Sequence, residues 1–178
     1  MEAAERVYDC RCLAAKCFDT EAENVVFTMN ATHGLNLAIK TLVQPGDHVV
    51  VSGFEHNAVM RPLYGLHANI SVAGRHLFDP EEAVTAFSKA ITPETAAVIC
   101  THVSNVFGYR LPIDQIAELC REKKVPLIVD ASQSAGILPI SCRAWGAAFV
   151  AMPGHKSLYG PQGTGILLCQ RALKPLLE

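Results

Sequence analysis

Short apolar runs alternate with helical patterns along the whole chain, and this alternation limits the fold more than any other feature. Runs typical of buried strands cover residues 25–28, 48–51, 70–73, 96–101, 126–129, 147–151 and 165–169, and helical patterns cover residues 2–17, 32–43, 57–66, 80–90 and 112–123. Strands that alternate with helices form a parallel sheet with crossover helices. The sequence therefore predicts a three-layer α/β fold with a mostly parallel seven-stranded sheet. The last run has no helix before it, which predicts that residues 165–169 form one antiparallel strand.

The composition fits one compact domain, or most of one. Half of the 178 residues are apolar, which disfavours disorder. The 15 basic and 17 acidic residues are spread along the chain, so no basic stripe suggests nucleic acid or an anionic membrane as a partner. The longest apolar runs, such as residues 125–129, are far shorter than the ~20 residues of a membrane span, and the amino terminus lacks an apolar signal core. We therefore expect a cytoplasmic protein.

The seven cysteines do not indicate a disulfide framework, because their number is odd and their spacing is irregular. Cys10, Cys12 and Cys17 fall in one predicted helix, where positions two apart do not face each other. No second Cys/His cluster completes a zinc set. We expect buried or reduced thiols and no metal site.

Segments that contain polar residues follow five of the predicted strands, at the edge where parallel α/β sheets bind ligands. They are Ala31 and Thr32, Glu55 and His56, Ser104 and Asn105, Asp130 to Gln133, and the segment around Lys156. Taken alone, Thr32 is a residue type that caps a helix, His56 is a surface residue at a helix start, and Asn105 is part of a turn. None of these three residues indicates a function by itself.

Asp130 and Lys156 point more strongly to chemistry. Asp130 ends an apolar strand, so its carboxylate needs a partner, and a protonated pyridine nitrogen, an arginine or a helix N-terminus would serve. Lys156 lies in residues 152–165, which contain four glycines, two prolines and one lysine and have no helix or strand period. Such glycine density suggests that the backbone passes close to another group. A partly desolvated lysine in such a segment is a usable amine nucleophile.

Together, these segments resemble the aminotransferase class V (fold type I) enzymes that use pyridoxal 5'-phosphate (PLP), and within them the cysteine desulfurase and selenocysteine lyase branch. The resemblance is carried by Ala-Thr at 31–32, Glu-His at 55–56, Ser-Asn-Val at 104–106, Asp-Ala-Ser-Gln at 130–133 and Gly-His-Lys-Ser-Leu-Tyr-Gly-Pro at 154–161. It covers the chain from residue 24 onward. It implies that residues 1–178 form an incomplete PLP-binding large domain, with the C-terminal small domain absent from this chain.

The resemblance implies a catalytic role for two residues. Lys156 would hold PLP as a Schiff base and move protons at the substrate α-carbon. His56 would stack on the cofactor ring and help with proton transfer. Asp130 would keep the ring nitrogen protonated, so that the ring acts as an electron sink.

The resemblance assigns the other candidate residues to cofactor binding. Gln133 would donate a hydrogen bond to the ring oxygen, and Asn105 would contact the ring oxygen or the substrate carboxylate. Ala31 and Thr32 would bind the phosphate at a helix N-terminus, assisted by His155.

The chain departs from the family pattern in two places. The family usually has Ser-Gly-His-Lys where this chain has Pro153 before Gly-His-Lys, which removes one phosphate-binding hydroxyl. The chain also stops at Glu178, so the nucleophilic cysteine loop, the substrate-binding arginine and a Gly-Thr segment that reaches the partner subunit's phosphate would lie beyond it. None of the seven cysteines matches the catalytic one. We therefore expect little desulfurase turnover from this chain alone.

The implied activity of the full-length protein is removal of sulfur or selenium from cysteine or selenocysteine to leave alanine, in a homodimer that passes sulfur to an acceptor protein. Other class V reactions, such as transamination or epimerisation, stay open because specificity lies outside this chain. An inactive partial domain that only binds cofactor or a partner also stays open. A simple nucleotide-binding domain is disfavoured, because no Gly-x-Gly-x-x-Gly follows the first strand.

Overall fold

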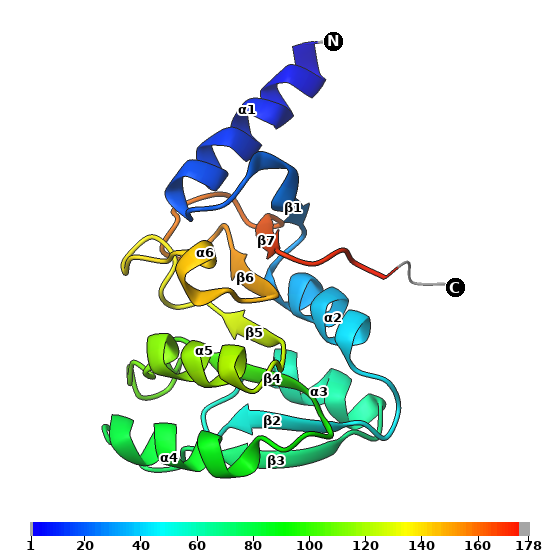
Figure 1. Ribbon diagram of the computed structural model, residues 1–178. Helices are drawn as coiled ribbons and strands as arrows, with labels where there is room; N and C mark the ends of the chain where they lie inside the picture. Colours follow the sequence, from blue (N-terminus) through cyan, green and yellow to red (C-terminus); the bar gives the residue numbers. More distant parts are fainter. Residues whose placement is uncertain (1, 175–178) are drawn as a thin grey trace.

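The computed structural model describes residues 2–174, and its centre is a seven-stranded sheet with the strand order β1-β7-β6-β5-β4-β2-β3 (Figure 1). The strands are β1 (Val25–Thr28), β2 (His48–Ser52), β3 (Asn69–Ala73), β4 (Thr95–Thr101), β5 (Leu127–Asp130), β6 (Phe149–Pro153) and β7 (Gly165–Cys169). The helices are α1 (Glu2–Cys17), the short 3-10 helix η1 (Ala22–Asn24), α2 (Ala31–Leu42), α3 (Asn57–Gly65), α4 (Pro80–Ala90), α5 (Ile113–Glu122) and α6 (Cys142–Trp145).

Strand direction follows the prediction. The strands from β2 to β6 pair in parallel, whereas β7 runs antiparallel to both of its neighbours, β6 and β1. The predicted mostly parallel seven-stranded sheet, with an antiparallel strand at residues 165–169, is confirmed. Because β1 and β6 are both antiparallel to β7, β1 points the same way as the parallel strands. The carboxyl ends of all strands except β7 therefore lie at one edge of the sheet.

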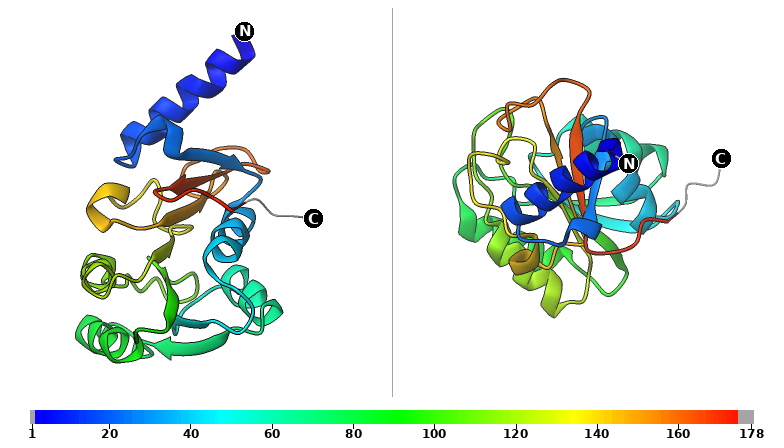
Figure 2. Two further views of the ribbon diagram at one scale, coloured as in Figure 1. Left: turned by 45° about the vertical axis from the view of Figure 1, so that its right-hand side comes forward. Right: turned by 90° about the horizontal axis from the view of Figure 1, so that it is seen from above.

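Helices cover both faces of the sheet, as parallel sheets require. Figure 2 shows α2 and α3 on one face and α4, α5 and α6 on the other. Successive side chains of a strand point to opposite faces, so Val49 and Val51 pack into the core beneath α2 and α3, whereas Val50 packs into the core beneath α4 and α5. Burial on both faces explains why the strands are continuous apolar runs.

One strand and one helix differ most from the sequence prediction. β6 begins at Phe149 and reaches Pro153, two residues later than the predicted strand at residues 147–151. Residues 147–152 are all apolar and therefore give no period that would locate the ends of the strand. The helix α6 was not predicted, because four residues are too few for a helical period. It begins at the cap residue Ser141 and ends at Gly146, whose φ of 58° is left-handed.

Helix α1 projects away from the sheet, and only the part near its C-terminal end is packed (Figures 1 and 2). Ala14 and Ala15 are buried, whereas Val7, Tyr8 and Leu13 are exposed. Among residues 2–174, no helix has the length and apolar content needed to cross a bilayer.

Candidate functional site

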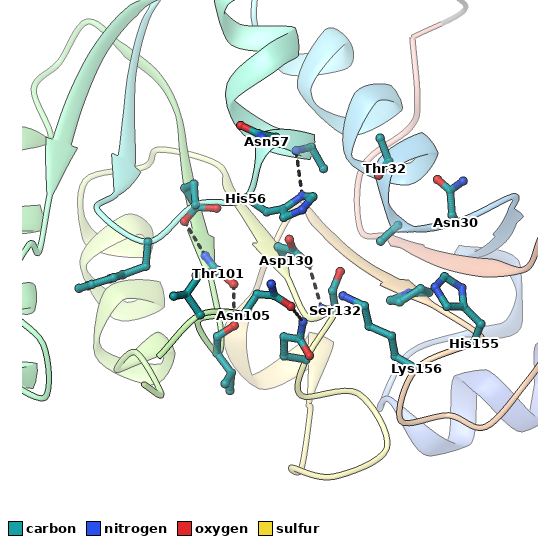
Figure 3. Close-up of a pocket in the computed structure, with 18 residues that line it drawn as sticks. Asn30, Thr32, His56, Asn57, Thr101, Asn105, Asp130, Ser132, His155 and Lys156 are labelled. Atoms are coloured by element: carbon teal, nitrogen blue, oxygen red, sulfur yellow. Dashed lines mark hydrogen bonds between the residues drawn. The ribbon is translucent and has the colours of Figure 1, made fainter. Parts of the chain in front are cut away.

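A cavity of about 470 Å³ opens at the carboxyl edge of the sheet (Figure 3). All eight residues singled out from the sequence line it: Ala31, Thr32, His56, Asn105, Asp130, Gln133, His155 and Lys156. They come from the segments that follow β1, β2, β4, β5 and β6. The fold therefore brings together residues that the sequence spreads over most of the chain. Among residues 2–174, no group of three or more His, Cys, Asp or Glu side chains could hold a metal ion.

The start of α2 forms one wall of the cavity. The cap residue is Asn30, whose side-chain oxygen accepts a hydrogen bond from the backbone N–H of His33 at 2.8 Å. The sequence favoured Thr32 as the capping residue, and this was wrong: Thr32 is the second residue of the helix. Asn30 takes the role because its backbone is fully extended, with φ −174°. The N–H groups of Ala31 and Thr32 lie in the first turn, where no helical carbonyl can accept them.

His56 is the N-cap of α3. Its Nδ1 accepts a hydrogen bond from the backbone N–H of Ala58 at 3.0 Å. An accepting Nδ1 carries no proton, so the proton of the neutral ring sits on Nε2. The cap thereby fixes both the orientation and the tautomer of the imidazole, and Figure 3 shows the ring beside the cavity.

Asp130 is the last residue of β5 and is only 4% exposed. Its Oδ1 accepts a hydrogen bond from the N–H of Ser132 at 2.9 Å, and no ion pair within residues 2–174 includes it. Burial raises the pKa of Asp130, while the hydrogen bonds from Ser132 and the charges of Lys156 and His56 oppose the rise. A buried carboxyl group of this kind favours a cationic partner within the cavity.

Lys156 lies in the loop from Gly154 to Thr164 that joins β6 to β7, which we call the lysine loop, and its amine points into the cavity (Figure 3). Backbone hydrogen bonds close the loop at its base: Gly154 donates to the Thr164 carbonyl at 2.8 Å, and Gly160 donates to the Gly154 carbonyl at 2.7 Å. A Cβ at Gly165 would lie 2.8 Å from the carbonyl carbon of Asn30. Gly165, the first residue of β7, therefore lets the end of the loop pass close to the backbone of Asn30.

Asn105 and Gln133 come from neighbouring strand ends and are joined by a hydrogen bond from Gln133 Nε2 to Asn105 Oδ1. His155 lies on the side of the cavity toward Asn30 (Figure 3). Asn105 and Gln133 thus form one polar pair, and His155 lines the same cavity as the start of α2.

Pro153 also lines the cavity, in the place where the sequence analysis noted a missing hydroxyl. It is buried at the end of β6, opposite Gly165 of β7. The pairing of β6 with β5 ends earlier, at Ala151 and Asp130. A proline is tolerated here because it needs no N–H for a further strand partner.

The cavity has lining residues to which the sequence analysis gave no role. They include Asn30, Phe54, Glu55, Thr101, Val103, Val106 and Ser132. Glu55 makes the longest-range contact among them: its Oε1 accepts the N–H of Thr101 at 2.7 Å. Glu55 is adjacent to His56 in the motif, but nothing in the local sequence indicates that its carboxyl reaches β4.

The chemistry of the cavity fits PLP. The free N–H groups at the start of α2 could hold a phosphate, and the buried carboxyl of Asp130 could hold a protonated ring nitrogen. The amine of Lys156 could bond to an aldehyde carbon. These three requirements are met by described residues around one cavity.

Comparison with known proteins gives a consistent result. The family model described as aminotransferase class-V matches residues 1–178. The chain is 35% identical over 186 residues to the cysteine desulfurase IscS of Shewanella sp. (strain W3-18-1), covering 99% of this chain and 45% of that protein. It is 31% identical to a probable cysteine desulfurase of Methanothermobacter thermautotrophicus, covering 99% of this chain and 46% of that protein.

Solved structures share the fold. The apo structure of a cysteine desulfurase from Thermococcus onnurineus NA1 has a TM-score of 0.86 and 25% identity, covering 99% of this chain and 46% of that chain. SspA in complex with cysteine has a TM-score of 0.88 and 27% identity, covering 99% and 53%. The chain thus spans about half the length of the relatives it matches.

Proposed function

The chain belongs to the aminotransferase class-V family of PLP enzymes, in its cysteine desulfurase branch, and from this membership we propose that the whole protein is a PLP-dependent lyase. The reaction that we propose removes sulfur from cysteine, or selenium from selenocysteine, to leave alanine. The names of the relatives support this substrate class, and one similar structure holds cysteine.

The observation that carries the proposal is the meeting of Lys156 and Asp130 at one cavity. A buried carboxyl group that forms no ion pair with any other residue from 2 to 174 and a lysine amine line the same space, beside a helix N-terminus. When bound, PLP supplies a ring that withdraws electrons from the substrate α-carbon. Asp130 accepts the N–H of the ring nitrogen and keeps it cationic. Lys156 binds the cofactor through its amine and moves a proton at the α-carbon.

The remaining residues position the cofactor and the substrate. The imidazole of His56, fixed by its bond to Ala58, stacks on the ring and assists proton transfer. Gln133, which is hydrogen-bonded to Asn105 in the cavity wall, would donate to the ring oxygen, and Asn105 would contact the ring oxygen or the substrate carboxylate.

The phosphate binds at the start of α2. The N–H groups of Ala31 and Thr32 and the field of the helix N-terminus attract the anion, and His155, which lines the same cavity, assists. Pro153 contributes no hydroxyl here, so the phosphate depends more heavily on these backbone groups.

The architecture of the whole protein is also part of the proposal. Residues 1–178 form a partial PLP-binding large domain, and a small C-terminal domain outside this chain supplies the nucleophilic cysteine and the substrate-binding arginine. Coverage of only 45% of the first relative supports this division. We propose a homodimer that hands sulfur to an acceptor protein.

Borohydride trapping tests the cofactor assignment. The full-length protein is loaded with PLP, reduced with borohydride, digested and analysed by mass spectrometry, and we expect the pyridoxyl mass on the peptide that contains Lys156. Lys156→Ala removes the label while PLP still binds noncovalently, whereas Lys89→Ala, a change of an exposed lysine on α4, keeps the label. A label on another lysine, or no label on the folded protein, overturns the assignment.

Product analysis tests the reaction. With cysteine as substrate, a desulfurase releases alanine and passes sulfur to a thiol acceptor. A transaminase instead releases a 2-oxo acid, and an epimerase inverts the α-carbon. Either of the last two products in place of alanine assigns the site to another class V reaction.

A further inference from the structure

Glu55 ties the end of β2 to the end of β4 beneath the cavity. The pairing of β2 with β4 ends at Val51 and Ile99, so the N–H of Thr101 lies beyond the last strand pair. Glu55 Oε1 supplies the missing acceptor at 2.7 Å and also accepts a hydrogen bond from the hydroxyl of Ser52. Thr101 is in turn the register partner of Asp130 on β5. The carboxyl of Glu55 therefore helps to fix the position of Thr101 at the end of β4, next to Asp130.

The second oxygen of Glu55 has no partner. Oε2 is shielded from solvent and makes no hydrogen bond within residues 2–174. No ion pair within those residues includes Glu55, although His56 and Lys156 line the same cavity. A shielded oxygen without a partner costs far less in a neutral carboxylic acid than in a charged carboxylate.

The groups that face Glu55 favour the neutral form. Asp130 faces it from β5 and Cys100 lies near it on β4, so neither offers a positive charge. His56 borders the cavity from the start of α3, and Lys156 borders it from the lysine loop. The positive charges of both residues act on Asp130, whose pKa they lower. Burial raises the pKa of Glu55 to about 8, the bond from Ser52 opposes the rise, and the charge of Asp130 adds to it.

We propose that Glu55 is a neutral carboxylic acid that positions the floor of the cavity, so that Asp130 is the carboxylate that carries negative charge there. The structural part of this inference is independent of the cofactor, and its consequence for PLP rests on the function proposed above. With Glu55 neutral, the ring nitrogen meets one anionic partner. Loss of the proton from Glu55 places a second negative charge at the end of β4. Part of that charge then lies on Oε2, which is shielded from solvent.

Infrared spectroscopy of the full-length protein without PLP tests the neutral state directly. The difference spectrum of wild type minus Glu55→Gln should contain the carbonyl stretch of a protonated carboxyl at pH 6, and this band should vanish at pH values well above 8. Glu118→Gln, which changes an exposed glutamate on α5, should give no such band. A carboxylate signal for Glu55 already at pH 6 overturns the proposal.

PLP binding by the same variants tests the positioning role. A glutamine can accept from Thr101 and donate as a neutral acid does, so Glu55→Gln should retain most of the PLP affinity. Glu55→Ala leaves the N–H of Thr101 unpaired and should lose roughly tenfold. Between pH 7 and 9 the affinity of the wild type should fall as Glu55 ionises, while the affinity of Glu55→Gln should not follow that transition.

The infrared and PLP-binding experiments together distinguish failure of this inference from failure of the proposed function. If Glu55→Gln loses as much affinity as Glu55→Ala, or keeps the wild-type pH transition, the positioning role of a neutral Glu55 is wrong. If the wild type binds no PLP, the proposed function fails, and the infrared arm still decides whether Glu55 is neutral.

Discussion

Gly136, in the turn that follows β5, lies directly against the backbone carbonyl of Ser157 in the lysine loop. A Cβ at Gly136 would overlap that carbonyl, and the φ of Gly136 is 88°, in the region that favours glycine. Asp130 ends the strand before this turn, Gln133 lies in the turn itself, and Lys156 directly precedes Ser157. Two of the five segments that carry candidate cofactor residues therefore fit together through one glycine.

We predict that Gly136→Ala displaces the lysine loop. The positive φ costs the variant about 1–3 kcal/mol of unfolding free energy, and the overlap with Ser157 pushes the loop away. The fraction of protein labelled at Lys156 after PLP loading and borohydride reduction should fall. Gly46→Ala is the matched control, because Gly46 has a φ of 84° but nothing near its missing Cβ. It should lose similar stability and keep its label, and equal labelling of both variants would show that the Gly136 contact does not position Lys156.

The double role of His56 gives a second prediction. His56→Asn preserves an N-cap for α3, since asparagine caps well, whereas His56→Ala removes the cap and should cost about 0.5–2 kcal/mol. Both variants lose the imidazole that we propose stacks on the PLP ring. Denaturant unfolding should therefore separate the two variants, while the absorbance of bound PLP and the turnover should change in both. If turnover survives in His56→Asn, the ring of His56 has no part in the reaction.

Because Asp130 is buried, we predict that PLP binding depends on pH. Burial raises its pKa above the ordinary value of 3.8. As the pH falls through this raised pKa, the carboxylate takes up a proton and the ring nitrogen loses its anionic partner, so PLP affinity should fall at a higher pH than an exposed aspartate would allow.

The variant Asp130→Asn should bind PLP without this acidic transition. It should also lose about 1.5–3 kcal/mol of interaction with the ring cation, which corresponds to roughly 10- to 150-fold in turnover. Asp9→Asn, on the exposed part of α1, is the control. PLP titrations between pH 4.5 and 7.5 provide the measurement, and an unaltered acidic transition in Asp130→Asn would remove Asp130 from the cofactor site.

Much of this fold follows from local sequence. β7 was placed at residues 165–169 and predicted to be antiparallel, because no crossover helix precedes it, and the structure agrees. Helix α4 was predicted at residues 80–90 and occupies those residues, with Pro80 in its first turn and with Asp79 as the cap that accepts the N–H of Glu82. Because strand ends meet at one edge, the eight site residues could also be placed together.

What the sequence could not provide depends on contacts between distant residues. Asn30 and Thr32 are both capping types, and only the extended backbone of Asn30 decides between them. The carboxyl of Glu55 accepts the backbone N–H of Thr101, which is 46 positions away in the sequence. That N–H lies beyond the last pair of the strands β2 and β4. The glycine density around Lys156 was noted, but the atoms closest to Gly154 and Gly165 belong to the protein itself: the side chain of Thr164 and, at Gly165, the hydroxyl of Thr28 and the backbone of Asn30.

Pro153 gives the last prediction, which concerns the phosphate. Pro153→Ser returns a hydroxyl to the wall of the cavity, two residues before His155. One hydrogen bond to an anion should strengthen PLP binding by about 0.5–1.5 kcal/mol, or roughly two- to tenfold. Loss of the proline ring also frees the unfolded chain, which should cost about 0.4–1 kcal/mol of stability.

Pro153→Ala separates these two effects, because it frees the unfolded chain equally but adds no hydroxyl. Dissociation constants for PLP, and for inorganic phosphate as the probe of the phosphate site alone, should be lower for Pro153→Ser than for Pro153→Ala. The two variants should unfold at similar denaturant concentrations, because both retain the short strand β6 and its pairing with β7. Equal affinities for phosphate would mean that the anion does not bind beside residue 153. The start of α2 would then have to be tested on its own with a substitution at Thr32, which lines the cavity from the first turn of that helix.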